Sequence, residues 1–184
     1  MFFSQRGDDL IDDNTIMDLV KSGNKKAFEE IVIRHRLKAL RFAQKYVKDE
    51  FISEDIIQDS FALIYIKRMN YNNKYSFKTF LYTVIRNKCI DYLRKQTPVN
   101  IADIKLRTPS AEDIVMKKED RLFVTELLGK LNKEYKTALY LYEYEDMSYK
   151  DISKIMIKSI GQVKIIIFRA RKKLQKLARE DYRC

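Results

Sequence analysis

The chain has 184 residues, of which 46% are hydrophobic, and a formal net charge of +11. This apolar content suffices for one large or two small domains that each bury a core. No apolar stretch approaches the roughly 18 residues of a membrane span, and the two cysteines are too few for a disulfide framework. The composition therefore predicts a cytoplasmic protein that does not insert into a membrane.

Chemistry that needs a metal or a nucleotide has no visible site in the sequence. There are only four glycines, without a GxGxxG or P-loop pattern, and the single histidine, His35, has no cysteine or histidine cluster around it. No group of carboxylates on one helix face suggests a two-metal site. We expect no cofactor, no metal and no catalytic residue, which argues against an enzyme.

Positive charge is concentrated in two blocks. Residues 64–95 carry eight basic residues against one acidic, and residues 149–184 carry eleven against three. A solvated face would mix the signs, and solubility alone explains the total charge but not its segregation. Two cationic blocks suit a protein that follows a polyanion at two places.

Apolar residues recur at helical spacing almost throughout, with no convincing alternation of apolar and polar residues, which predicts an all-α protein. After a tail at 1–13, a first helix is expected at about 14–22 and is stopped by Gly23. Asn24 then caps a second, long core helix. A third helix is expected to start at Ser53, because the acidic residues that follow suit the positive end of the helix dipole.

A fourth helix, expected at about 76–95, separates into two faces when wound at ~100° per residue. One face is apolar and is expected in the core, with Phe77 and Phe80 among its members. The other carries side chains able to hydrogen-bond phosphates and bases: Thr79, Thr83, Arg86, Asn87 and Arg94. The loop before this helix adds Tyr71 and Tyr75, and aromatic rings beside cationic residues can hold an unstacked base. Core packing is the alternative for both tyrosines.

Both prolines of the chain fall at 96–109, a stretch that is poor in large apolar residues. We predict an extended linker there, which separates one small helical domain at 14–95 from a second at 110–184. In the second domain, Ser110 and Asn132 are expected to cap a fifth and a sixth helix.

Two hydroxyl-capped helix starts lie eleven residues apart, at Ser148 and Ser159. In each, the fourth residue, Asp151 or Gln162, can complete a capping box, and the second helix is strongly basic. The spacing fits one short helix and a tight turn, which is the outline of a helix-turn-helix. Its second helix is expected to reach base edges with its first turns and phosphates with its basic remainder. Two ordinary surface helices are the alternative.

These motifs resemble a known family. The segments at 19–30, 55–61, 77–87 and 91–94 are similar to domain two of the bacterial RNA polymerase sigma factors of the sigma-70 family. Those at 131–135, 147–152, 161–164 and 169–174 are similar to domain four. The resemblance runs from about 19 to 177, and the length and direct two-domain layout resemble the extracytoplasmic-function (ECF) group.

The resemblance implies partners and residue roles. The partners are promoter DNA, core RNA polymerase through its β′ clamp helices and β flap, and, as a regulator, an anti-sigma factor. The implied polymerase-binding residues are Asp55, Gln58, Asp59 and Phe61. The implied minus-ten residues are Tyr71, Tyr75, Lys78, Thr83, Arg86, Asn87 and Arg94. The implied minus-thirty-five residues are Ser159, Gln162, Lys164, Ile165, Arg169 and Lys172.

The acidic residues of the polymerase-binding set also have a reading from elementary chemistry. Asp55 and Asp59 lie one helical turn apart and can meet basic residues on a partner. Matching to the helix dipole is the alternative, and it explains Asp55 better than Asp59.

The linker at 96–109 resembles the family segment that threads through the polymerase near the RNA exit path.

The chain departs from the family in two places. The turn carries Ile157 and Lys158 where the family usually has Gly-Ile, and the recognition helix carries Ile165 and Ile166 where polar or basic residues are usual. Wound as a helix, Ile166 borders the core stripe, while Ile165 and Phe168 point to the basic side. Isoleucine can contact a thymine methyl group, which predicts a T-rich upstream preference. Packing against a protein partner is the alternative.

The expected function is that of an alternative sigma factor, a non-enzymatic subunit that binds core polymerase, recognises two promoter elements and stabilises the melted one. One rival is an autonomous helix-turn-helix regulator that does not use core polymerase. Another is an enzyme of nucleic-acid processing, which the missing carboxylate cluster disfavours.

Overall fold

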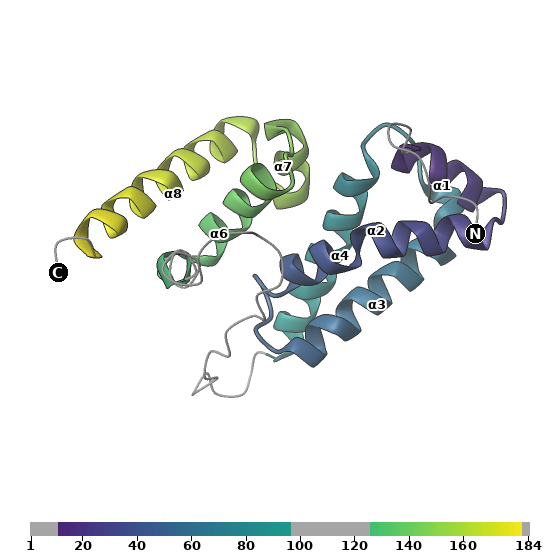
Figure 1. The fold of residues 1–184 in the computed structure, drawn as a ribbon, viewed down its shortest axis with the longest axis horizontal. Helices are drawn as coiled ribbons and strands as arrows, with labels where there is room; N and C mark the ends of the chain where they lie inside the picture. Colours follow the sequence, from purple (N-terminus) through teal and green to yellow (C-terminus); the bar gives the residue numbers. More distant parts are fainter. Residues whose placement is uncertain (1–10, 97–125, 182–184) are drawn as a thin grey trace, which may run out of the picture.

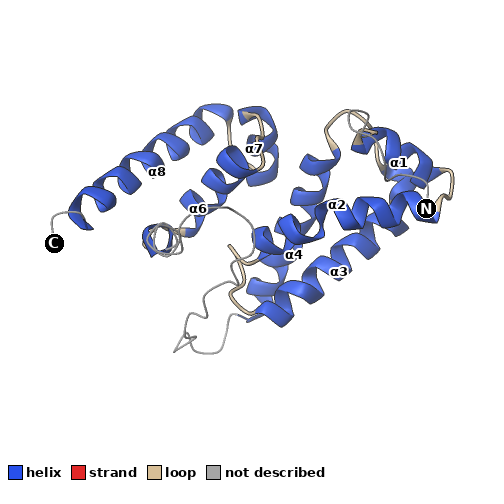
Figure 2. Cartoon of the chain, in the orientation of Figure 1, coloured by secondary structure: helices blue, strands red, loops and turns tan. Residues whose placement is uncertain are grey.

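The computed structural model describes residues 11–96 and 126–181, and these form helices joined by turns, with no strand among them (Figures 1 and 2). The all-α prediction is confirmed. The first half contains α1 (Asp13–Lys21), α2 (Lys25–Ala43), α3 (Glu50–Ile66), the short 3-10 helix η1 (Arg68–Asn70) and α4 (Phe77–Gln96). The second contains α6 (Lys133–Leu139), the π-helix η2 (Tyr140–Tyr144), α7 (Tyr149–Met156) and α8 (Ile160–Asp181). The predicted linker and the cap at Ser110 lie outside the described residues, apart from Gln96.

Capping side chains explain where several helices begin. The Asn24 side chain accepts the N–H of Ala27 at 3.1 Å, which starts α2. Gly23 has φ +92°, a left-handed conformation that lets the chain reverse between α1 and α2. The Asn132 side chain accepts the N–H of Tyr135 at 2.8 Å, which starts α6. The predictions at Gly23, Asn24 and Asn132 are confirmed.

The predicted start of the third helix was wrong. α3 begins at Glu50, because the Asp49 carboxylate accepts the N–H of Ile52 at 3.0 Å. Ser53 is buried inside the helix instead, and its hydroxyl donates to the carbonyl oxygens of Val47, at 3.1 Å, and of Asp49, at 2.7 Å. Aspartate and serine can both cap a helix, and here Asp49, which comes first in the chain, is the cap.

The helix-turn-helix prediction is confirmed. The Asp151 N–H donates to the Ser148 hydroxyl at 3.2 Å, which starts α7. At α8 the capping box is complete, because the Ser159 hydroxyl accepts the Gln162 N–H at 3.1 Å and the Gln162 side chain accepts the Ser159 N–H at 2.8 Å. α8 packs against α6 and α7, which fixes the two helices of the motif.

The turn between α7 and α8 holds a non-glycine residue in an unfavourable conformation. Ile157 has φ 54° and ψ 53°, and it is followed by a bond from the Lys158 N–H to the Ser153 carbonyl at 3.0 Å. This is the hydrogen bonding of a Schellman turn, whose left-handed residue is usually glycine. A β-branched residue there is strained by about 1–2 kcal/mol.

Replacing this isoleucine by glycine should stabilise the protein. We expect Ile157→Gly to raise the free energy of unfolding by about 0.5–1 kcal/mol, because relief of the strain exceeds the added entropy of the unfolded chain. The matched control is Ile160→Gly in the first turn of α8, which should lower it, since glycine is a poor helix former. Urea unfolding of both variants measures this, and equal destabilisation would contradict the strain.

The two halves of the chain touch in this structure. α2 packs against α1, α3 and α4 around a core that includes Phe42, Phe77 and Tyr82, all fully buried. α4 in turn packs against α7 of the helix-turn-helix (Figure 1). The position of α4 between the two halves matters for the site below.

Candidate functional site

The acidic surface of α3 is the first candidate site. Asp55, Gln58 and Asp59 are exposed, whereas Phe61 is only 5% exposed and meets Phe28 edge to face, with ring centroids 6.4 Å apart. Phe61 is therefore a core residue, one helical turn after the buried Ile57, and burial removes it from the polymerase-binding set. The earlier start of α3 also places Asp55 in the second turn, where the helix dipole explains its charge less well.

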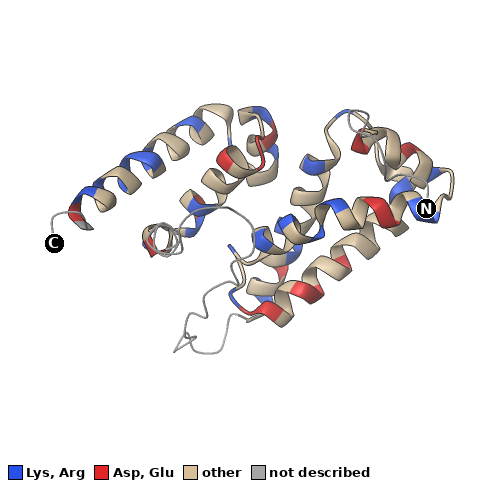
Figure 3. Cartoon of the chain, in the orientation of Figure 1, with Lys and Arg blue, Asp and Glu red and all other residues tan. Residues whose placement is uncertain are grey.

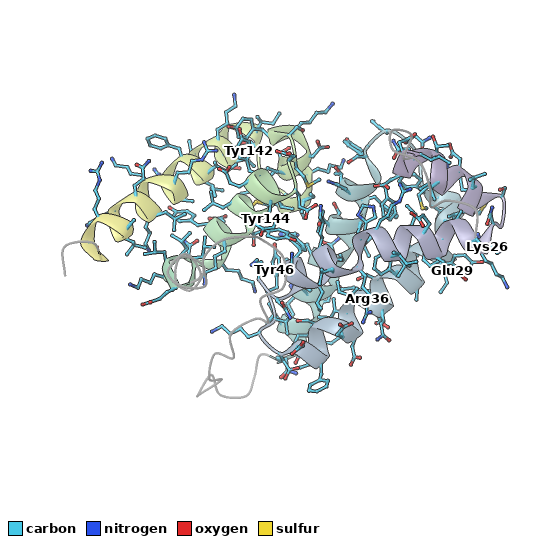
Figure 4. All side chains as sticks on the ribbon, in the orientation of Figure 1. Lys26, Glu29, Arg36, Tyr46, Tyr142 and Tyr144 are labelled. Atoms are coloured by element: carbon cyan, nitrogen blue, oxygen red, sulfur yellow. The ribbon has the colours of Figure 1, made fainter. Side chains whose placement is uncertain are left out.

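Ion pairs connect this surface to its neighbours. Lys88 of α4 lies 3.1 Å from Asp59, and Arg36 of α2 lies 3.0 Å from Glu54. Both pairs are partly solvent-exposed, so each contributes little to stability and can be exchanged for a partner's charges. Figure 4 labels Arg36 on α2.

Exposed apolar side chains accompany these charges, and the sequence reasoning missed them. Ile33 is 75% exposed and Leu37 50% exposed, one turn apart on α2 and flanking Arg36. Phe51 at the start of α3, close to Glu54 in the chain, is 84% exposed. The ion pair between Arg36 and Glu54 links the surfaces of α2 and α3. We name the combined surface the α2/α3 face; its residues are Ile33, Arg36, Leu37, Phe51, Glu54, Asp55, Gln58 and Asp59. An interface needs such apolar contact beside its charges.

Tyr71 is not available as a platform for a base. It is 4% exposed, its hydroxyl donates to the Asn14 side chain at 2.5 Å, and its ring lies 6.2 Å from that of Phe77. Burial, with Asp13 nearby, raises the pKa of Tyr71 to about 12. The sequence left two roles open for Tyr71, stacking on a base or packing in the core. The structure has Tyr71 packed in the core.

Tyr75 and Lys78 face the helix-turn-helix. The Lys154 ammonium donates to the Tyr75 hydroxyl at 3.1 Å and lies 4.4 Å from the ring centroid, and this hydrogen bond lowers the pKa of Tyr75. The Lys78 ammonium lies 3.6 Å from the carboxylate of Glu145. Thr79, expected on the accessible face of α4, is 1% exposed, and its hydroxyl donates to Asp151 at 2.9 Å.

The remaining minus-ten candidates lie further along α4. Thr83 and Arg86 are half-buried, and the Thr83 hydroxyl donates to the Thr79 carbonyl at 2.7 Å. Asn87 and Arg94 are exposed. The polar side of α4 thus divides into a first part covered by the second half of the chain and a later part that is open.

The minus-thirty-five candidates all lie on the surface of α8 or at its start: Ser159, Gln162, Lys164, Ile165, Arg169 and Lys172. Ile165 is 51% exposed and Phe168 66% exposed, whereas Ile166 is 8% exposed, as the helical winding predicted. Basic residues recur along α8 toward its C-terminal end (Figure 3). This combination can meet both phosphates and apolar groups of DNA.

An aromatic and cationic cluster supports the start of α8, and sequence reasoning did not find it. The rings of Tyr142 and Tyr149 stack at 5.0 Å, with Arg171 5.0 Å from the first ring and Lys164 5.6 Å from the second. Glu143 pairs with Arg171. The cluster holds α7 and α8 in fixed relation, since stacking and cation–π contacts each stabilise by about 0.5–1 kcal/mol at exposed sites.

Two further surveys concern only the described part of the chain. No helix in residues 11–96 or 126–181 is long and apolar enough to span a membrane. Across those same ranges, no group of three or more histidine, cysteine, aspartate or glutamate side chains is arranged to hold a metal ion.

Comparison with known proteins gives two family matches in the order of the two halves. The sigma-70 region 2 family matches residues 31–99, and the sigma-70 region 4 family matches residues 124–174. The chain is 30% identical to the RNA polymerase sigma-H factor of Pseudomonas aeruginosa, over 91% of this chain and 96% of that protein. It is 31% identical to the ECF RNA polymerase sigma factor SigM of Bacillus subtilis, over 81% of this chain and 93% of that protein.

Solved structures agree with the fold. CnrH, solved in complex with the cytosolic domain of CnrY, aligns with a TM-score of 0.67 at 24% identity, over 92% of this chain and 98% of that one. The sigma factor RpoE from Bartonella quintana, solved in complex with the anti-sigma factor NepR, gives 0.66 at 22% identity, over 84% and 98%. At these identities the likeness establishes the fold.

The two family matches, together with the helix-turn-helix in the second half, place the chain in the class of transcription initiation factors. The chain belongs to the sigma-70 family of bacterial RNA polymerase sigma factors, in the ECF group. It is an alternative sigma factor, and an autonomous regulator that works without polymerase is not favoured.

Proposed function

We propose that this sigma factor binds core RNA polymerase through the α2/α3 face and contacts promoter DNA with α4 and α8. The observation that carries the proposal is the placement of acidic and apolar residues on one exposed face and of cationic residues on two other helices. The charges separate the tasks, because a polyanion is repelled from the α2/α3 face and attracted to α4 and α8. The chain itself performs no catalytic step.

Within the first half, Asp55, Gln58 and Asp59 are the proposed contacts to polymerase, with Ile33 and Leu37 adding apolar area. Tyr75, Lys78 and the open residues Asn87 and Arg94 are the proposed contacts to the minus-ten element, together with Thr83 and Arg86. Phe61 and Tyr71 are left out of both sets because both are buried.

The setting proposed for this activity is the cytoplasm, where promoter DNA and polymerase are found. An anti-sigma factor is a proposed regulator, by analogy with the complexes of similar fold.

The decisive experiment is a pull-down of core polymerase by the purified chain, followed by runoff transcription. Specific duplex binding without any polymerase recruitment would favour the autonomous helix-turn-helix regulator instead.

The exposed Ile165 should read the methyl group of a thymine. Replacing the contacted thymine by deoxyuridine, which lacks this methyl, should weaken holoenzyme binding about fourfold, as expected for about 0.8 kcal/mol per buried carbon. Ile165→Ser should bind both promoters equally. Binding titrations on the paired promoters measure this.

The control for this experiment is Ile66→Ser at the end of α3, which changes an exposed isoleucine outside α8. It should retain the full preference for thymine. If Ile165→Ser still distinguishes the two promoters by the same factor, then Ile165 does not contact the methyl group, and its exposed side chain faces a protein partner.

A further inference from the structure

One side chain of α1 holds both ends of the loop that precedes α4. The amide oxygen of Asn14 accepts the Tyr71 hydroxyl at 2.5 Å and the backbone N–H of Phe77 at 3.2 Å. Tyr71 follows η1, and Phe77 is the first residue of α4. The segment at 71–77, which we call the α4 loop, therefore begins and ends at the same oxygen atom.

This arrangement completes the start of α4 with a side chain from another helix. The first N–H groups of a helix have no acceptor within it. The Ser76 hydroxyl accepts the N–H of Thr79 at 3.3 Å, and Asn14 accepts that of Phe77, a fully buried residue. Removal of the Asn14 oxygen would leave the Phe77 N–H buried without this acceptor, and an unpaired buried donor is costly.

A second side chain of α1 reaches the middle of the α4 loop. The Asn73 amide donates at 3.2 Å to the carboxylate of Asp18, one helical turn after Asn14. The Lys21 ammonium donates to the same carboxylate at 3.0 Å and lies 5.3 Å from the ring centroid of Tyr71. η1 and α4, which flank the loop, both pack against α1 (Figure 1). α1 therefore contacts the loop at its two ends and in its middle.

α1 is itself firmly placed, which a positioning residue requires. Three of its apolar side chains are buried in the core: Ile16, Met17 and Val20. The carboxylate of Asp13, next to Asn14 in the chain, lies 2.7 Å from Nε2 of His35 on α2. His35 is buried against Phe77, with ring centroids 5.2 Å apart. The first turn of α1 is thus fixed by α2 as well as by the loop.

We propose that Asn14 is a positioning residue that determines how selectively the chain reads the minus-ten element, although it does not touch DNA. The inference rests on the proposed role of Tyr75 and Lys78 in promoter contact. Tyr75 lies within the α4 loop and Lys78 directly follows Phe77, so the bonds of Asn14 set the place of both. Discrimination between bases needs such groups held within about 0.5 Å, whereas attraction to phosphates does not. A loosened loop should therefore lose selectivity more than affinity.

Three variants of the full-length chain test the bonds of Asn14. Asn14→Leu removes the oxygen with little change in size, and Tyr71→Phe removes one of its two donors. Asn14→Asp keeps the oxygen and should restore both bonds. The matched control is Val20→Ala, which weakens the packing of the same helix at a buried residue near its other end and leaves the polar contacts of α1 in place.

Holoenzyme made with each variant is used to select from promoter duplexes randomised across the minus-ten element, at a temperature where every variant is folded. Asn14→Leu and Tyr71→Phe should lower the preference for the best base by about twofold to tenfold, the range given by the net contribution of one hydrogen bond. Asn14→Asp and Val20→Ala should select as wild type does. The affinity for core polymerase should be equal in all, since the α2/α3 face is unchanged.

Hydrogen exchange of the free proteins tests the loop without any promoter. The Phe77 amide should exchange faster in Asn14→Leu than in wild type, and Asn14→Asp should restore its protection. Wild-type selectivity in Asn14→Leu, an unchanged exchange rate at Phe77, or an equal loss of selectivity in Val20→Ala would each overturn the inference. If exchange changes as expected but no protein, wild type included, selects a minus-ten sequence, the hold on the loop stands and the proposed function fails.

Discussion

Reversing the charges of Asp55 and Asp59 should lower the affinity for core polymerase by about 100-fold or more, since placing like charges across an interface costs several kcal/mol. The double variant Asp55→Lys with Asp59→Lys changes two exposed residues of α3, so the fold is retained. The loss of the Asp59 pair with Lys88 is a small effect, because the pair is exposed to solvent. Titration of labelled polymerase, with runoff transcription, measures the loss.

The matched control carries the same change in net charge elsewhere. Glu126 and Glu180 are exposed, and each lies within ion-pair distance of a lysine four residues away in the chain. The variant Glu126→Lys with Glu180→Lys should bind polymerase as wild type does. Equal losses in the two double variants would mean that overall charge, and not the α2/α3 face, governs the association.

Local signals in the sequence predicted most of the fold. Asn24, Asn132, Ser148 and Ser159 each act through a hydrogen bond within three residues, so the chain alone identifies them. Ser53 was the exception, because Asp49 competes for the same role with the same chemistry. The exposure of Ile165 and the burial of Ile166 also followed from helical winding.

The site was harder to predict because burial is decided by distant parts of the chain. The resemblance to the family implies functional roles for Phe61 and Tyr71, yet both side chains are buried in the core. Tyr71 bonds there to Asn14, which lies 57 residues away in the chain. Thr79 lies on the polar side of α4 as expected, but the second half of the chain covers it. Winding a helix on paper shows which residues share a side, not what lies against that side.

Phe61 and Phe51 test this distinction on a single helix. Phe61→Ala should lower the free energy of unfolding by about 3–5 kcal/mol, because it removes a buried ring and leaves a cavity. Phe51→Ala should change it by less than about 0.5 kcal/mol, because the ring is 84% exposed, against 5% for Phe61. Chemical unfolding followed by circular dichroism measures both.

Polymerase binding should respond in the opposite order when it is measured below the unfolding transition. Phe51 belongs to the α2/α3 face, so Phe51→Ala should weaken binding severalfold although the protein is as stable as wild type. The fraction of Phe61→Ala that remains folded should bind normally, because its surface is unchanged. A stable Phe61→Ala that no longer binds polymerase would show that this ring leaves the core on docking, and the assignment of Phe61 to packing would then be wrong.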